Sequence, residues 1–263
     1  MTASPPTAIQ AGLTFAPAPG AASASSMLRA QTLMELKLSL RNGEQVGLTL
    51  LIPLLLEFFF NLPMLYSLDG RRIDFVVPSV LALAVMSASF TGLSIGTGFE
   101  RKYGVLKRLG ATALPRHILL LGKTMAVLIL QVFQATLICA FGLTLGWQLH
   151  GNAGWAVVLI IVATFTFGGL GLLLAGTVRA EVTLAAANLV WLVLLFAGGI
   201  AVPLSKYGGT ARDVLQYLPS AALSDGLHDV LQHGHGLPLR ETITLLVWGA
   251  VALPAAARWF KWE

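Results

Sequence analysis

Long runs of apolar residues dominate the chain, and short polar segments separate them. Residues 124–178 contain no Lys, Arg, Asp or Glu, and this stretch is too long for one membrane-spanning helix of about 20–25 residues. The polar residues 148–152 predict a turn between two spans. The runs also exceed the roughly 10-residue alternating strands of a membrane β-barrel. The pattern predicts an all-α, polytopic membrane protein with six transmembrane helices, at about 46–65, 75–98, 124–147, 154–178, 182–204 and 239–257.

The N-terminal residues have a different character from the spans. Residues 1–25 are rich in Ala, Ser, Pro and Thr and carry no charged side chain. Because the basic region and apolar core of a signal peptide are both missing, we expect a disordered cytoplasmic tail. The next segment is expected to form an amphipathic interfacial helix, capped by Ser26 and reaching about Arg41. The chain is thus divided into the tail 1–25 and a six-span domain 26–263, and the apolar face of the interfacial helix holds Leu33, Leu36 and Leu40.

Composition supports a membrane protein and excludes other classes. The chain has 263 residues, of which 56% are hydrophobic and 11% charged, and its mean hydropathy is +0.78. Soluble domains carry about 25% charged residues, and disordered chains combine high charge with low hydrophobicity. The single cysteine, Cys139, excludes an intramolecular disulfide.

The distribution of basic residues predicts the orientation. With the N-terminus inside, 12 of the 17 Lys and Arg residues fall on the cytoplasmic side. Cytoplasmic loops carry the excess of Lys and Arg, so we expect both termini inside. The excess of Lys and Arg in cytoplasmic loops accounts for the net charge of +5, so we expect no nucleic-acid partner. The five outer basic residues would be Arg71, Arg72, Lys206, Arg212 and Arg240.

The segment between the second and third predicted spans is the most informative part of the chain. An acid is followed by bases and a glycine, and residues 106–109 then read Leu-Lys-Arg-Leu. This order predicts a short amphipathic cytoplasmic helix with an apolar side to offer a partner. A simple positive-inside anchor is the alternative. The candidate interface residues are Glu100, Arg101, Lys102, Gly104, Leu106, Lys107, Arg108 and Leu109.

Several segments in register resemble the permeases of type-2 ABC transporters, the drug- and lipid-exporting two-component systems of bacteria. Residues 100–109 resemble the coupling region of these permeases, together with 113–116 and 122–123. The resemblance covers about residues 30–260. Three further matches are the Gly-rich exit of span five at 198–204, the outer Leu-Pro segment at 217–220 and the start of span two at 74–78.

The resemblance implies a six-span permease domain in the bacterial plasma (inner) membrane that works as a homodimer or heterodimer. A separate ABC ATPase subunit would dock on the coupling helix and would hold the ATP and Mg. The expected activity is ATP-driven export of a hydrophobic or amphipathic substrate such as a drug or lipid. Replacing Glu100, or reversing Arg101 and Arg108, is expected to uncouple ATPase activity from transport. Glu57 and the N-terminal tail depart from the family pattern.

Sequence motifs for catalysis or nucleotide binding are missing. Gly122-Lys123-Thr124 ends like a Walker A motif, but His117 occupies the position of its first glycine. The sequence contains no Cys/His pair and no His-Glu-x-x-His motif. We therefore expect the chain to bind no cofactor and not to be an enzyme.

Polar residues inside predicted spans are candidates for a substrate pathway. Glu57 lies near the middle of the first span, where a carboxylate is costly and marks either a pathway or a contact with a neighbouring helix. Asn61, one turn later, is its expected hydrogen-bonding partner. Asn188 in the fifth span bonds a neighbouring helix or contacts substrate. Glu57 also supports the alternative of a proton-coupled secondary transporter, and a non-transporting scaffold is a third reading.

Two further patterns complete the expectations. His228, His233, His235, Asp225 and Asp229 make the only histidine and carboxylate cluster, but they lack the fixed spacing of a zinc motif, so no metal site is expected. Small-residue pairs predict close packing of helices. These pairs are Gly92/Gly96, Gly142/Gly146 and Gly168/Gly171.

Overall fold

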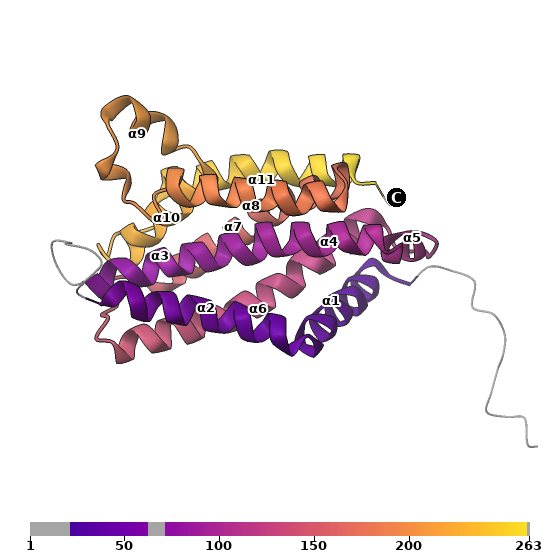
Figure 1. The fold of residues 1–263 in the computed structure, drawn as a ribbon, viewed down its shortest axis with the longest axis horizontal. Helices are drawn as coiled ribbons and strands as arrows, with labels where there is room; N and C mark the ends of the chain where they lie inside the picture. The colour runs from indigo at the N-terminus through magenta and orange to yellow at the C-terminus, as the bar shows by residue number, and fades with distance from the viewer. Residues whose placement is uncertain (1–21, 63–71, 262–263) are drawn as a thin grey trace, which may run out of the picture.

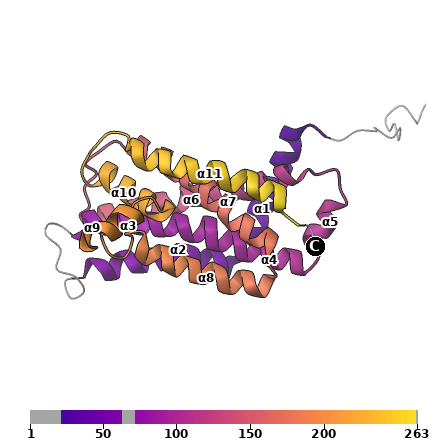
Figure 2. The same cartoon turned by 90° about the horizontal axis from the view of Figure 1, so that it is seen from above.

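The computed structural model describes residues 22–62 and 72–261. Throughout these ranges the regular structure is helical, which confirms the predicted all-α class. Figure 1 shows an elongated bundle whose long helices run side by side, and Figure 2 shows the same bundle turned by 90°. The helices that run along the bundle are α2 (Gly43–Asn61), α3 (Arg72–Met86), α4 (Leu93–Lys102), α6 (Arg116–Thr144), α7 (Ala153–Thr177), α8 (Ala180–Ala197) and α11 (Leu239–Trp259).

The remaining elements lie at the two ends of the bundle (Figure 1). One end, here called the α5 end, holds the described C-terminus, α1 (Ala24–Arg41) and α5 (Val105–Gly110). The opposite end, here called the α10 end, holds the 3-10 helix η2 (Leu204–Lys206), α9 (Gly209–Leu215) and α10 (Pro219–Leu231).

Five helices in the described residues are long and apolar enough to cross a membrane: Arg72–Lys102, α6, α7, α8 and α11. Helices α1 and α2 also pass the length and hydropathy criteria when they are taken together, but they are bent by 71° relative to each other. Counting this pair as one broken span gives a sixth span. The prediction of a six-span membrane protein therefore agrees with the five to six candidate helices.

The second span is one continuous helix with a local irregularity. Residues Ser87–Gly92 form a π-helical turn, η1, between α3 and α4. Helix α7 passes close to this turn, because a Cβ atom added at Gly171 would lie 2.6 Å from the carbonyl oxygen of Phe90. Glycine is therefore required where the two helices meet. Helix α7 also packs against α11 and α10, which places it at the centre of the bundle.

Several predicted boundaries differ from the observed ones. The third span begins at Arg116 rather than 124, because Pro115 with extended backbone (ψ 147°) precedes the helix and residues 116–123 continue it. The fifth span ends at Ala197 rather than 204, since the chain turns at Gly199 with a left-handed φ of +72°. The predicted end of the first span at 65 lies outside the described residues.

The N-terminal helix is present but differs in detail from the prediction. Helix α1 is capped by Ser23, whose hydroxyl accepts from the Ser26 amide, so Ser26 is not the cap. Its polar residues Gln31 and Thr32 are buried on the side that packs against α6, while Leu33 is 63% exposed. The polar side of the helix therefore faces the protein. Most of the expected tail, residues 1–21, lies outside the described residues.

Candidate functional site

The turn between α4 and α5 sets the position of the candidate coupling helix. Gly104 has a left-handed φ of +70°, which lets the chain reverse directly into α5. Leu106 is completely buried and belongs to a cluster with Leu119, Leu120 and Phe260. The expectation that Leu106 is offered to a partner is therefore not met, because its side chain is covered by α6, α7 and the C-terminal segment.

The outward surface of α5 combines two basic residues with apolar ones. Lys107 and Arg108 are exposed, as are Val105 and the preceding Tyr103, whose exposed fraction is 68%. Leu109 is half-buried against the same cluster as Leu106. We call the exposed residues Tyr103, Val105, Lys107 and Arg108 the α5 surface.

Charged residues at the end of α4 point in different directions. Arg101 donates to the backbone carbonyl of Val178, in the turn between α7 and α8. Lys102 lies 2.5 Å from a carboxylate oxygen of Glu181, and both side chains are largely exposed. Glu100 turns inward. Of the predicted interface residues, Glu100, Arg101 and Leu106 thus brace α4 and α5 against the bundle rather than forming the outward surface.

A buried ion triad connects three helices at the α5 end. Lys123 of α6 is only 3% exposed, and its Nζ lies 2.7 Å from Glu35 Oε1 of α1 and 2.6 Å from Glu100 Oε2 of α4. Gln31 of α1 donates to the same Glu35 oxygen at 2.7 Å. A Cβ atom at Gly122 would lie 2.5 Å from the Gln31 side chain. Helix α1 is therefore fixed to α6 by ion pairing and by close approach.

Sequence analysis did not identify this triad. The sequence points to Lys123 only through the coupling segment and the incomplete Walker A pattern, and nothing in it singles out Glu35. The available signal was the position of Lys123, the last charged residue before the uncharged stretch 124–178. A lysine in that position needs an acidic partner, because an unpaired buried charge is costly.

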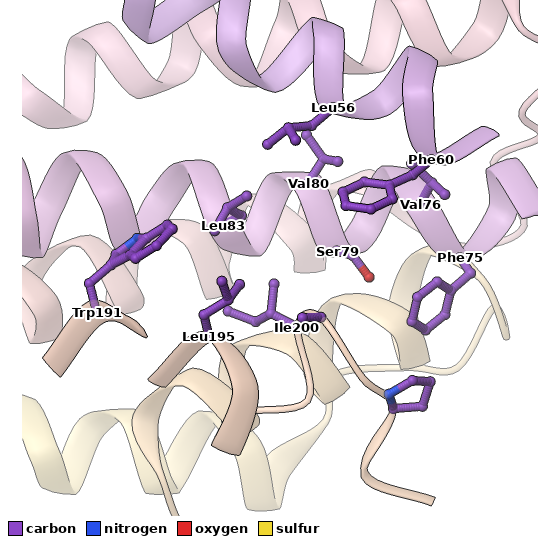
Figure 3. A pocket seen from close by; sticks show the side chains of 12 residues that line it. Leu56, Phe60, Phe75, Val76, Ser79, Val80, Leu83, Trp191, Leu195 and Ile200 are labelled. Atoms are coloured by element: carbon purple, nitrogen blue, oxygen red, sulfur yellow. The ribbon is translucent and has the colours of Figure 1, made fainter. Parts of the chain in front are cut away.

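An apolar cavity of about 190 Å³ lies in the half of the bundle near the α10 end (Figure 3). Its walls come from α2, α3, α8 and the segment after α8. Ser79 supplies a hydroxyl to an otherwise apolar lining, and Trp191 donates from its indole nitrogen to Ser87 at 2.9 Å. The lining residues are Leu56, Phe60, Phe75, Val76, Ser79, Val80, Leu83, Trp191, Leu195, Ile200, Ala201 and Pro203.

A larger groove of about 960 Å³ runs along α1, α2, α4, α6 and α8. Its lining includes the triad residues at the α5 end and Leu56, Leu83 and Trp191, which also line the apolar cavity. Thr97 lies on its wall, and the Thr97 hydroxyl is buried without a hydrogen-bond partner among the described residues. The groove therefore has charged groups at one end and an apolar surface further along.

The structure separates the predicted pathway residues. Glu57 is completely buried, and its carboxylate packs against α6, since a Cβ atom at Gly142 would lie 2.8 Å from Glu57 Oε1. Neither carboxylate oxygen has a hydrogen-bond partner among the described residues, so the expected bond from Asn61 is absent. Asn188 lines the groove and donates to the Leu184 carbonyl of its own helix at 2.9 Å. Glu57 lines neither the cavity nor the groove.

At the α10 end, His228 joins α10 to the cavity wall. Its Nδ1 lies 2.7 Å from the Ser224 carbonyl, and its Nε2 lies 3.2 Å from both the Ser79 hydroxyl and the Phe75 carbonyl. Burial lowers the pKa of His228. A neutral ring donates from Nδ1 to Ser224 and accepts from Ser79 at Nε2. His228 is therefore a structural contact between α10 and α3.

The fold and these sites define a multi-pass membrane protein, and sequence comparison gives its family. The family described as "ABC-2 family transporter protein" matches residues 71–258. This chain belongs to that family. The protein named "Putative transport permease YvfS" of Bacillus subtilis (strain 168) is 24% identical over 232 residues, which cover 84% of this chain and 91% of that protein.

Family membership confirms the resemblance on which the sequence predictions relied. It assigns the chain a transport permease role, and members of this family are transport components rather than enzymes. It also implies, in general, an ABC ATPase as the partner subunit.

Proposed function

We propose that the chain is the membrane-spanning subunit of an ATP-driven exporter in the bacterial plasma membrane. The observation that carries this proposal is the α5 surface, an exposed basic face held rigidly to the bundle by Leu106 and by the triad behind it. A partner that pushes on such a surface moves the helices to which it is fixed. Both termini would be cytoplasmic, because basic residues concentrate at the α5 end.

Force applied to α5 has two routes into the bundle. Leu106 contacts the start of α6 and the C-terminal segment through its buried cluster. The ion pair of Glu100 with Lys123 connects α4 to α6, and that of Lys123 with Glu35 continues to α1. ATP would favour one conformation of the partner ATPase, and through these contacts would shift the permease between inward-open and outward-open states.

The cavities support a hydrophobic or amphipathic substrate such as a drug or lipid. The groove offers charged groups near the α5 end and an apolar wall beyond them, and it meets the apolar cavity at Trp191. A charged end followed by an apolar wall can bind a molecule with a polar head and an apolar body. In the assembled exporter a second permease, identical or homologous, would complete a dimer that surrounds the pathway.

Transport by proteoliposomes that contain the permease and its ABC ATPase tests the proposal. A fluorescent lipid and an apolar dye serve as cargo, and either ATP or a pH gradient serves as the energy source. Leu195→Trp fills the apolar cavity and is expected to reduce ATP-driven transport. The matched control is Leu189→Trp on the same helix, at a position that is 63% exposed and lines neither cavity.

One result would contradict the proposal, and a second would contradict only its assignment of the substrate route. Transport driven by a pH gradient without ATP would favour the alternative of a proton-coupled transporter. Equal transport by Leu195→Trp and Leu189→Trp would exclude the apolar cavity from the substrate route while leaving the ATP-driven assignment intact.

A further inference from the structure

Three side chains that could hold a metal ion meet at the α10 end. Asp229, His233 and His235 each offer one ligand atom, and these atoms all lie within 4.8 Å of one another. Nδ1 of His233 lies 3.4 Å from Asp229 Oδ1, and Nδ1 of His235 lies 3.7 Å from the same oxygen. The two imidazole rings are stacked with their centroids 5.7 Å apart.

These distances match the size of a metal coordination sphere. Zinc binds histidine nitrogen and carboxylate oxygen at about 2.0–2.2 Å, so two ligands of a tetrahedral ion lie about 3.3 Å apart. Both measured separations to the Asp229 oxygen are close to that value. All three side chains are between 39% and 70% exposed, so they can reorient by the remaining distance without disturbing the core.

The backbone around the three residues is well fixed. Asp229 lies in α10 beside the fully buried Leu227 and Val230. The amide of His235 donates to the Asp229 carbonyl at 2.9 Å, and this bond brings the second histidine back over the end of the helix.

A glycine between the two histidines permits this return. Gly234 has a left-handed φ of +71°, and a Cβ atom there would lie 2.7 Å from the carbonyl oxygen of His150 in the turn between α6 and α7. That turn is itself bonded to α10, since the His150 amide donates to the Leu231 carbonyl. The three ligands are therefore presented on a preorganised corner where two loops meet.

We propose that Asp229, His233 and His235 form a binding site for one divalent transition-metal ion. Two imidazoles and one carboxylate are a donor set that zinc uses with a water molecule in the fourth position. The bound ion would link the end of α10 to the loop that leads into α11. This site is independent of the proposed export activity, and it departs from the expectation, based on spacing alone, that no metal site exists.

Calorimetric titration of the full chain with Zn²⁺ tests the site. The protein is purified in detergent through a tag that contains no histidine and is treated with a chelator before the titration. We expect one Zn²⁺ per chain, and at least about tenfold weaker binding for His233→Ala/His235→Ala. Asp229→Asn is also expected to weaken binding. The matched control is His117→Ala, because His117 is another exposed histidine and lies in the first turn of α6, the helix that follows α5.

A spectroscopic measurement checks the geometry. Co²⁺ in place of Zn²⁺ should give visible absorption bands of a four-coordinate ion, and these bands should be lost in His233→Ala/His235→Ala. Thermal unfolding without metal establishes that each variant is folded. The proposal is overturned if the wild-type chain gives no heat of binding, or if the double variant and His117→Ala bind Zn²⁺ equally well.

Discussion

The ammonium nitrogen of Lys123 lies 2.6 Å from a carboxylate oxygen of Glu100, at a point where the lysine side chain is only 3% exposed. Glu35 of α1 places its Oε1 atom 2.7 Å from the same nitrogen. One base thus holds two acids together, and through them the N-terminal helix α1 and the last turn of α4. The triad is both a stability element and the most direct physical connection between α1 and the helix that leads to α5.

Lys123→Met is therefore expected to destabilise the protein strongly. The change leaves Glu35 and Glu100 facing each other without a base, and breaking a buried ion pair by removing one partner costs about 3–5 kcal/mol. Thermal unfolding in detergent measures the loss. The triple variant Glu35→Gln/Lys123→Met/Glu100→Gln removes the unpaired charges and should recover part of the stability. A Lys123→Met protein that unfolds at the wild-type temperature would show that the triad is not formed.

Close packing around the π-helical turn gives a second prediction. Gly171→Ala places a Cβ atom 2.6 Å from the Phe90 carbonyl, and overpacking of this kind costs about 1–3 kcal/mol. Gly96→Ala is the matched control, since nothing lies within 4 Å of a Cβ atom there and alanine favours a helix. Thermal unfolding should therefore shift downward for Gly171→Ala alone. Equal shifts for the two variants would contradict the observed approach of α7 to η1.

Glu57→Gln is expected to leave ATP-driven transport at the wild-type rate. Glutamine has nearly the same shape as glutamate, and Glu57 packs against Gly142 of α6 instead of lining either cavity. Rates in proteoliposomes with ATP as the energy source provide the measurement. Loss of transport in a variant that inserts and folds normally would instead support proton coupling through Glu57.

Stability at the α10 end should depend on pH through Asp225. Burial raises the pKa of this carboxyl from 3.8 to about 6, and the nearby Arg240 opposes the shift. Between these values the folded protein binds more protons than the unfolded chain, so stability falls as the pH rises. Above about pH 6 the Asp225 carboxyl is ionised in the folded protein, and the full free-energy cost of burying its charge lowers the stability of the fold.

Asp225→Asn removes that charge. The variant should be more stable than the wild type at pH 7.5 by on the order of 3 kcal/mol, and the difference should disappear as the pH approaches 4. Unfolding of both proteins across this pH range gives the comparison. A stabilisation that stays constant with pH would exclude titration of Asp225 as the cause.

The helices and their approximate positions follow from the sequence because length and hydropathy decide which segments cross a membrane. Residues 154–178 were predicted and α7 spans Ala153–Thr177. Ends set by local geometry were harder to predict. The fifth span stops at Ala197 because the backbone turns at Gly199, and apolar residues after the turn line the cavity instead of extending the helix.

Side-chain roles depended on contacts between segments distant in the chain. Gly171 lies where helices meet closely, as its pairing with Gly168 predicted, but Gly96 faces open space although its spacing from Gly92 is similar. The Leu-Lys-Arg-Leu pattern correctly indicated a short helix. It did not reveal that Leu106 faces inward, because the residues that cover it come from α6, α7 and the C-terminus.

Co-purification of the ABC ATPase tests the central claim most directly. The tagged chain is isolated in mild detergent from its native membrane, and the associated proteins are identified by mass. We expect a stoichiometric ATPase with the wild type and with Lys206→Glu, a matched charge reversal at the α10 end. The ATPase should be lost with Lys107→Glu/Arg108→Glu on the α5 surface. An ATPase that stays bound to that variant, or a wild-type preparation without any ATPase, would contradict the account.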